Sequence, residues 1–248
     1  MKKTVILVAG GKGLRMGGDL PKQFIPMDGK PILMHTTAVF YQWDSQAELL
    51  IVVPEAYTTY WQMLCKELNF TIPHRLVPGG ETRFHSVRNA LQTLGGAGSC
   101  TDDSFRTHEA DCAGSCTVAC VDSYMVDDDA LIAVHDGVRP YVSAELITAC
   151  FNAAEKYGAA IPVTPMIESV REITGAESRP FDRTRLRIVQ TPQVFRSTIL
   201  YEAYQQPYND RFTDDASVVE SSGHKIYLVA GKPENIKITT IDQLKIKK

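Results

Sequence analysis

The feature that most constrains the fold is the run Val5-Ile-Leu-Val-Ala9, a continuous apolar stretch that ends directly in glycines. A strand without polar alternation is typical of a parallel sheet that is buried on both faces. Comparable runs follow at Glu48–Val53, Ala130–Val134 and Ala159–Val163, separated by segments with helical patterns. This alternation predicts an α/β fold with a Rossmann-like, open, mostly parallel sheet and helices on both faces.

Residues 164–190 interrupt the alternation. Ser169–Ile173 and Leu186–Val189 have the pattern of exposed strands, with a turn region at Gly175–Pro180 between them. We therefore expect a projecting β-hairpin arm. Beyond it, the alternation resumes with expected helices near 197–204 and 214–221 and expected strands near Lys225–Val229 and Ile236–Ile238.

The charge of the chain is unevenly distributed. Its 248 residues carry 26 Lys and Arg against 29 Asp and Glu, a formal net charge of −3. Residues 1–30 hold six basic and two acidic side chains, whereas residues 95–130 hold eight acidic side chains and only Arg106. The strand–helix pattern fails over the acidic stretch, so we predict one domain over residues 1–248 with a surface insertion at 95–127.

The cysteines follow the same division, because four of the six lie in the acidic stretch. Their spacing matches none of the usual zinc-binding pairs, so we expect free thiols. No apolar run approaches the roughly 18 residues of a membrane span, and Met1-Lys2-Lys3 leads straight into a strand-like run without a cleavage site. The sequence therefore predicts a cytoplasmic protein with neither a membrane nor a nucleic-acid polymer as partner.

The sharpest chemical signal is Gly10-Gly11-Lys12-Gly13-Leu14-Arg15, followed by Pro21-Lys22-Gln23. Glycines after a strand let backbone N–H groups approach phosphates without a Cβ in the way, and the cations add positive charge beside them. The spacing is not that of a Walker A loop, and Met16 stands where a dinucleotide-binding loop has its third glycine. A plain strand–turn–helix connection is the structural alternative.

Later segments place more polar residues at strand ends. Pro78-Gly79-Gly80-Glu81-Thr82-Arg83, with Ser86 just beyond, is a second glycine turn that enters a helix. His135-Asp136-Gly137-Val138-Arg139-Pro140 follows a central strand, at the carboxyl edge where open α/β sheets bind ligands. The series continues in chain order with Thr191-Pro192-Gln193, Thr213–Ser217 and Asn235–Thr239.

With these motifs in this order, the chain resembles the 2-C-methyl-D-erythritol 4-phosphate cytidylyltransferase family over nearly its whole length, except 95–127. The resemblance implies a nucleotidyltransferase that joins CMP from CTP to a polyol phosphate and releases pyrophosphate, with Mg²⁺ carried mainly by the CTP phosphates. Because the attacking phosphate has a second pKa of about 6, neither a side-chain nucleophile nor a strong general base is required. Catalysis then depends on in-line positioning and charge stabilisation.

The resemblance also implies roles for residues at the matching motif positions. Arg15 and Lys22 would stabilise the triphosphate and the transition state, and Arg183 and Lys237 would hold the attacking phosphate. The implied nucleotide-binding residues are Ala9, Gly10, Gly11, Gly13, Gly80, Glu81 and Ser86. The implied second-substrate residues are Asp136, Arg139, Ser169 and Thr191, with no metal ligand among the side chains. In the family the arm crosses a twofold axis, so we expect a homodimer in which the arm residues Ser169 and Arg183 serve the partner's site.

Three other functions stay open at this point. Val8-Ala9-Gly10-Gly11 stands where the family has Pro-Ala-Ala-Gly. The arm is longer than the family's compact pattern, and this keeps ribitol 5-phosphate cytidylyltransferase, which shares the glycine loop, in consideration. A nucleotide-binding module without turnover would lack a catalytic cation. A dinucleotide-dependent dehydrogenase is opposed by the absent third glycine.

Several of these side chains also have structural alternatives. Arg183 fits a solvated strand face, Lys237 an edge strand, and Arg139 an ion pair with Asp136. Asp214 has the position of a helix cap. We expect His135 to order its loop rather than to act as a base.

Overall fold

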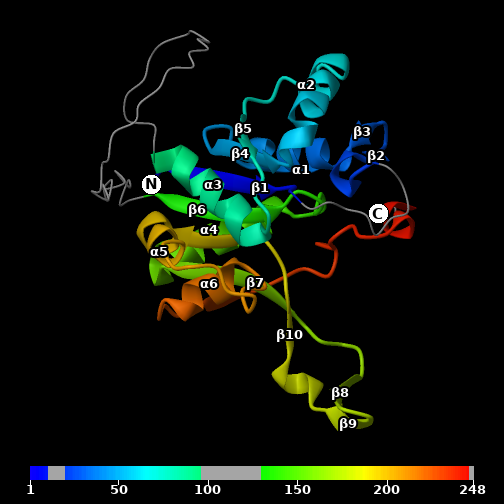
Figure 1. Ribbon diagram of the computed structural model, residues 1–248, viewed down its shortest axis with the longest axis vertical. Helices are drawn as coiled ribbons and strands as arrows, with labels where there is room; N and C mark the ends of the chain where they lie inside the picture. Colours follow the sequence, from blue (N-terminus) through cyan, green and yellow to red (C-terminus); the bar gives the residue numbers. More distant parts are fainter. Residues whose placement is uncertain (11–19, 96–129, 246–248) are drawn as a thin grey trace, which may run out of the picture.

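The computed structural model describes residues 1–10, 20–95 and 130–245, and eight strands within these ranges form one sheet (Figure 1). The strand order is β10 (Arg187–Val189), β7 (Ala159–Pro165), β11 (Gln193–Arg196), β6 (Leu131–Asp136), β1 (Lys3–Val8), β4 (Glu48–Val53) and β5 (Arg75–Pro78), with β12 (Tyr227–Ala230) also paired to β7. Strands β6, β1, β4 and β5 run parallel, as do β7 and β12. Strand β10 runs antiparallel to β7, and β11 runs antiparallel to both β6 and β7. The predicted open, mostly parallel sheet is confirmed.

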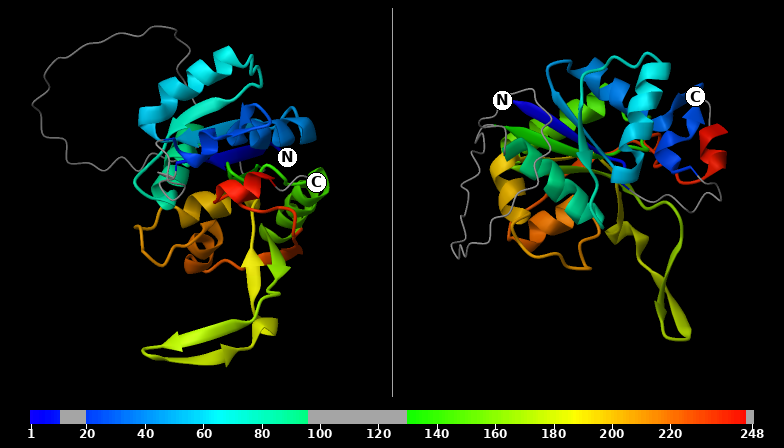
Figure 2. Two further views of the ribbon diagram at one scale, coloured as in Figure 1. Left: turned by 90° about the vertical axis from the view of Figure 1, so that its right-hand side faces the viewer. Right: turned by 45° about the horizontal axis from the view of Figure 1, so that its top comes forward.

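Helices cover both faces of this sheet (Figures 1 and 2). Along β1, Val5 and Leu7 enter one core while Ile6 enters the other. The first core is shared with α1 (Ile32–Trp43), α2 (Thr58–Glu67) and α4 (Ala144–Tyr157). The second is shared with α3 (Arg83–Gly95), α5 (Ser197–Ala203) and α6 (Asp215–Ser221). Burial stabilises each such aliphatic side chain by about 1.5–3 kcal/mol. A strand with apolar side chains on both faces is therefore most stable at the centre of the sheet, where helices cover both faces.

Short elements complete the described chain. The strands β2 (Pro26–Met27) and β3 (Lys30–Pro31) form a small separate pair. The 3₁₀ turns are η2 (Lys22–Phe24), η3 (Glu55–Tyr57), η4 (Arg183–Arg185) and η5 (Ile241–Lys245). Within the described ranges, no helix is long and apolar enough to cross a membrane.

The arm projects from the sheet as an antiparallel hairpin of β8 (Val170–Thr174) and β9 (Glu177–Phe181) (Figure 1). The predicted second strand, Leu186–Val189, was wrong as part of the hairpin: β10 belongs to the central sheet, where Val189 lies opposite Val163. The turn is also shorter than predicted, because Pro180 lies inside β9 opposite Arg171. The exposed β9 lacks the apolar alternation by which strands are found in a sequence.

The predicted strand at Ile236–Ile238 was also wrong, since this segment joins no sheet. The Ile238 N–H donates one hydrogen bond to the Val138 carbonyl at 2.9 Å. Ile238 is fully buried beside Ile32 and Val138. An alternating apolar pattern predicts extended backbone with one buried face, and here that face is covered without a strand partner.

Some predictions fall outside the described residues. These are Gly11, Gly13, Arg15 and nearly all of the insertion expected at 95–127, with its four cysteines. The two cysteines within the described ranges, Cys65 and Cys150, are free thiols, as expected. Desolvation raises the pKa of Cys150 to about 12, which keeps this buried thiol protonated.

Candidate active site

Two adjoining cavities open at the carboxyl edge of the sheet. The first, of about 520 Å³, is lined by eight of the predicted residues: Ala9, Gly10, Lys22, Gly80, Glu81, Ser86, Asp136 and Lys237. The second, of about 290 Å³, is lined by Arg139 and Thr191. Asp136 and Lys237 line both cavities. The structure thus brings together the predicted residues of the sheet edge and separates them into two neighbouring groups.

The second glycine turn is packed too closely for a side chain. A Cβ on Gly80 would lie 2.4 Å from the His85 Cβ, and one on Gly10 would lie 3.1 Å from the Ser86 hydroxyl oxygen. That hydroxyl accepts a hydrogen bond from the Gly80 N–H at 3.0 Å and donates one to the Thr82 carbonyl at 2.9 Å. Ser86 therefore holds the turn against the end of β1, with backbone facing the first cavity.

Lys22 is carried to the first cavity on the 3₁₀ turn η2. The neighbouring Gln23 is buried, and its amide donates a 2.6 Å hydrogen bond to the carbonyl of Ala9, just beyond β1. Phe24 packs edge-on against Tyr60, with ring centroids 5.4 Å apart. These contacts anchor the lysine segment to the strand that carries the glycine loop.

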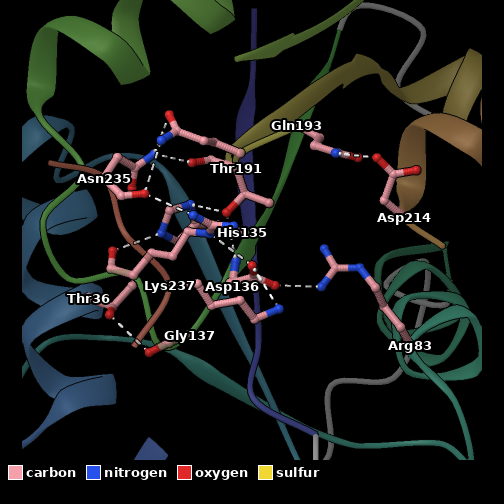
Figure 3. Close-up of polar contacts among 12 residues, drawn as sticks. Thr36, Arg83, His135, Asp136, Gly137, Thr191, Gln193, Asp214, Asn235 and Lys237 are labelled. Carbon is pink, nitrogen blue, oxygen red and sulfur yellow. Dashed lines mark hydrogen bonds and ion pairs between the residues drawn. The ribbon is translucent and has the colours of Figure 1, made fainter. Parts of the chain in front are cut away.

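Asp136 is the electrostatic centre of the wall between the cavities (Figure 3). One carboxylate oxygen accepts from Arg83 at 2.8 Å, and the other lies 2.9 Å from the Arg139 Nε and 3.2 Å from the Lys237 Nζ. Although desolvation opposes its charge, these three cations hold the pKa of the Asp136 carboxyl far below its usual value. Asp136 is therefore an anion that gathers cations at the site.

His135 orders the loop after β6, as the sequence predicted. Its ring is fully buried, its Nε2–H donates to the Arg139 carbonyl at 3.1 Å, and its Nδ1 accepts from the Thr191 hydroxyl at 3.0 Å. The same hydroxyl accepts from the Asp136 N–H at 3.1 Å. This network fixes one tautomer of a neutral imidazole. Desolvation lowers the pKa of His135 to about 3, so the ring is neutral near neutral pH.

The segment around Lys237 is held by two amide side chains that were not predicted as site residues. The buried Asn235 donates to the Thr191 carbonyl at 2.8 Å, and its own carbonyl accepts from Arg139 at 2.8 Å (Figure 3). Gln190 donates to the Lys232 carbonyl at 2.8 Å. Because Asn235 lies two residues before Lys237, these bonds fix where that lysine meets the site.

Arg83, Asp214 and Gln193 also line the second cavity and were not predicted as site residues. Asp214 caps α6, as the sequence predicted, and its other carboxylate oxygen accepts from Gln193 at 2.8 Å. Arg83, Asp214 and Gln193 each lie inside a motif noted in the sequence. The signal was therefore present, but the sequence did not show which motif residues face the cavities.

The arm residues Ser169 and Arg183 stand apart from the rest of the predicted site. Both are exposed and neither lines either cavity. Arg183 donates a hydrogen bond to the Ile167 carbonyl within the arm. A single chain therefore leaves these two residues outside the group that it assembles at the sheet edge.

Two adjoining cavities at the carboxyl edge of a parallel sheet, lined by glycine turns and by Lys22, Arg139 and Lys237, define the class as a nucleotide-binding α/β protein that handles phosphates. Among the described residues that line the two cavities, no Ser–His or Cys–His pair is present. Comparisons with known proteins narrow this class to one family.

The family model described as IspD, 2-C-methyl-D-erythritol 4-phosphate cytidylyltransferase, matches residues 3–117 and 117–248. Curated relatives carry the same name: that of Phocaeicola vulgatus is 46% identical over 246 residues, spanning 99% of this chain and 98% of the relative. That of Bacteroides thetaiotaomicron is 44% identical with the same spans. The crystal structure of the Francisella tularensis protein is 26% identical, with a TM-score of 0.71, over 99% of this chain and 97% of that one. The chain belongs to the 2-C-methyl-D-erythritol 4-phosphate cytidylyltransferase family and is a nucleotidyltransferase.

Proposed function

We propose that the two cavities hold the two substrates of a cytidylyl transfer, CTP in the first and 2-C-methyl-D-erythritol 4-phosphate in the second. The observation that carries this proposal is their common wall, where Asp136 and Lys237 line both spaces. A phosphate oxygen in the second cavity can then attack the α-phosphate of CTP across this wall. The products are 4-diphosphocytidyl-2-C-methyl-D-erythritol and pyrophosphate.

Catalysis in this arrangement depends on positioning and charge. The glycine turn at Gly10 and Gly80 brings backbone close to the triphosphate, and Lys22 supplies a cation from the side of η2. Arg15, which follows Gly13 by two residues in the sequence, is proposed to act with Lys22 on the transition state. Lys237, with a side chain 41% exposed, can exchange part of its interaction with Asp136 for the attacking phosphate.

The second substrate is proposed to meet Arg139 and Thr191. Arg139 is nearly buried and is already oriented by Asp136 and the Asn235 carbonyl, so it loses little side-chain freedom on binding. Thr191 is buried with its hydroxyl between the Asp136 N–H and His135. Its role is therefore to hold the β6 loop in place beside the polyol phosphate.

Mg²⁺ is proposed to be carried by the CTP phosphates. Magnesium commonly keeps several waters and takes substrate phosphates as ligands. The described residues contain no cluster of three or more acidic, histidine or cysteine ligands, and both oxygens of Asp136 already contact cations. The side chains of this wall therefore suit a Mg²⁺ ion that is held mainly by the nucleotide phosphates. Bound there, the ion would neutralise part of the charge of the triphosphate.

The arm is proposed to complete the site of a second copy in a homodimer. Ser169 and Arg183 lie outside both cavities of their own chain, and the arm exposes Ile167 and Ile173 at 73% and 69%. Exposed apolar side chains on a projecting hairpin favour contact with another protein surface. Complementation tests this: Arg183→Ala and Lys22→Ala chains, each inactive alone, should regain up to about a quarter of wild-type activity when co-refolded as random dimers.

A substrate competition tests the activity itself. Purified chain with CTP and Mg²⁺ should release pyrophosphate with 2-C-methyl-D-erythritol 4-phosphate, and Lys22→Ala should abolish that release. The ribitol 5-phosphate alternative is not favoured, because the family model and relatives at 43–46% identity carry the methylerythritol name. Turnover of ribitol 5-phosphate alone would refute the proposal. We also propose that the reaction takes place in the cytoplasm, since both substrates are highly charged metabolites.

A further inference from the structure

We infer that Arg83 is a positioning residue of the active site, which fixes the Asp136 carboxylate so that Lys237 stays directed at the attacking phosphate. The inference rests on the proposed role of Lys237 in holding that phosphate. Arg83 is the first residue of α3 and lines both cavities. It therefore stands at the wall where the two substrates are proposed to meet.

The guanidinium of Arg83 bridges two carboxylates from different elements. Its Nη1 donates to Asp136 of β6 at 2.8 Å, and its Nη2 donates to Asp215 of α6 at 2.7 Å. The two carboxylates are 7% and 0% exposed. A planar fork with fixed donor directions can orient both acids at once, which a lysine ammonium cannot do in the same way.

Among the described residues, the Asp215 carboxylate contacts the site through this bridge. It lines neither cavity, and its second oxygen accepts a hydrogen bond from the buried Tyr204 hydroxyl at 2.7 Å. Both oxygens of this fully buried acid are thus engaged. A chain of polar contacts runs from Tyr204 through Asp215 and Arg83 to Asp136, and from there to Lys237.

The consequence concerns the orientation of Asp136. While Arg83 occupies one oxygen, only the other is shared by Arg139 at 2.9 Å and Lys237 at 3.2 Å. Without Arg83, the carboxylate is free to turn and offer both oxygens to Lys237 or Arg139. That stronger pairing withdraws the lysine from the attacking phosphate and weakens the in-line alignment.

The test uses variants graded by their distance from the cavities. Arg83→Gln removes the bridge, Asp215→Asn weakens it from outside both cavities, and Tyr204→Phe removes only the outermost hydrogen bond. We expect kcat/KM for 2-C-methyl-D-erythritol 4-phosphate to fall about ten- to a hundredfold in Arg83→Gln, less in Asp215→Asn and least in Tyr204→Phe. The dissociation constant of CTP·Mg²⁺, measured without the second substrate, should change by less than about threefold in Asp215→Asn and Tyr204→Phe.

Two further measurements separate positioning from a structural role. Millimolar guanidinium should partly restore turnover to Arg83→Ala, because the vacated space opens to both cavities. Tyr201→Phe is the matched control: it removes the 2.8 Å hydrogen bond from a buried tyrosine to the Leu91 carbonyl and should lower the melting temperature without changing kcat/KM.

The outcomes are decisive in either direction. A folded Arg83→Gln chain with kcat/KM for the polyol phosphate within about twofold of wild type overturns the inference. So does a rise in the CTP dissociation constant for Arg83→Gln without any catalytic change in Asp215→Asn, which would indicate direct contact with the triphosphate. If Arg83→Gln fails to fold, Asp215→Asn and Tyr204→Phe give the answer. A wild-type chain without pyrophosphate release refutes the proposed function instead.

Discussion

Acidification should destabilise the folded chain through His135, and the size of this effect follows from the burial of the ring. The imidazole is fully buried, with one nitrogen donating to Arg139 and the other accepting from Thr191. Protonation would turn the accepting nitrogen into a donor that faces a hydroxyl already donating to it. The informative perturbation is His135→Gln, which keeps an amide donor and acceptor but has no titratable group.

The sign and magnitude come from the difference between the folded and unfolded pKa values. The pKa of His135 is lowered from 6.5 to about 3 by desolvation, so between these values the unfolded chain binds more protons than the folded one. The contribution of the neutral ring to the free energy of unfolding is therefore fully present above pH 6.5 and is lost as the pH falls towards 3. At 1.36 kcal/mol per unit, the loss reaches about 3 kcal/mol near pH 4.5.

Urea unfolding at a series of pH values measures this loss, because the free energy of unfolding follows from linear extrapolation. The difference between wild type and His135→Gln should shrink by about 3 kcal/mol between about pH 7.5 and 4.5. The pKa of His74 is also lowered by burial, but this contribution is common to both chains and cancels. Thr36→Val is the control, because its buried hydroxyl donates to the Gly137 carbonyl at 3.0 Å without titrating. The difference in unfolding free energy between wild type and Thr36→Val should not vary with pH. Parallel wild-type and His135→Gln curves would refute the reasoning.

Three other changes have expected outcomes. Gly80→Ala should cost about 1–3 kcal/mol in urea unfolding and raise the KM for CTP, because its Cβ would lie 2.4 Å from the His85 Cβ; an unchanged KM would contradict the close packing. Gln23→Leu removes the 2.6 Å hydrogen bond that ties the Lys22 segment to the end of β1, at a cost of about 1–3 kcal/mol. Its kcat for pyrophosphate release should fall, and a purely thermal effect would argue against anchoring. Replacing residues 98–126 by a short Gly-Ser linker should leave kcat/KM within about threefold of wild type, and a large fall in a folded chain would show that the insertion takes part in catalysis.

The central strands could be predicted because burial on both faces leaves a continuous apolar run, as in β1, β4, β6 and β7. Strand β9 could not be found, because exposed residues on an arm carry little apolar periodicity. Leu186–Val189 was predicted as a strand but assigned to the hairpin, because an exposed strand at the edge of the sheet has the same pattern as one on an arm. Ile236–Ile238 shows the converse. Its alternation indicates one buried face. The same pattern arises whether that face belongs to a strand or to a segment outside the sheet that packs on Val138.

At the site, the sequence located the motifs but not the pairs between them. Arg83 was visible in the second glycine turn, yet its partners Asp136 and Asp215 lie 53 and 132 residues away in the chain. Such distant pairing depends on how α3, β6 and α6 meet, which a local pattern does not contain. The arm residues are the opposite case: Ser169 and Arg183 were assigned by resemblance, and their own chain leaves them away from both cavities.

The charge of the wall explains how a chain with a net charge of −3 can handle two polyanions. Two like charges about 4 Å apart repel by about 4 kcal/mol at an effective dielectric constant of 20, so an anion between neighbouring cations offsets their repulsion. Asp136 contacts Arg83, Arg139 and Lys237, and Asp215 adds a second anion behind Arg83. Among the side chains that meet at Asp136, three cations face two carboxylates, while Glu55, Glu81 and Asp214 also line the cavities. A phosphate that reaches this wall therefore meets cations already gathered and oriented around Asp136.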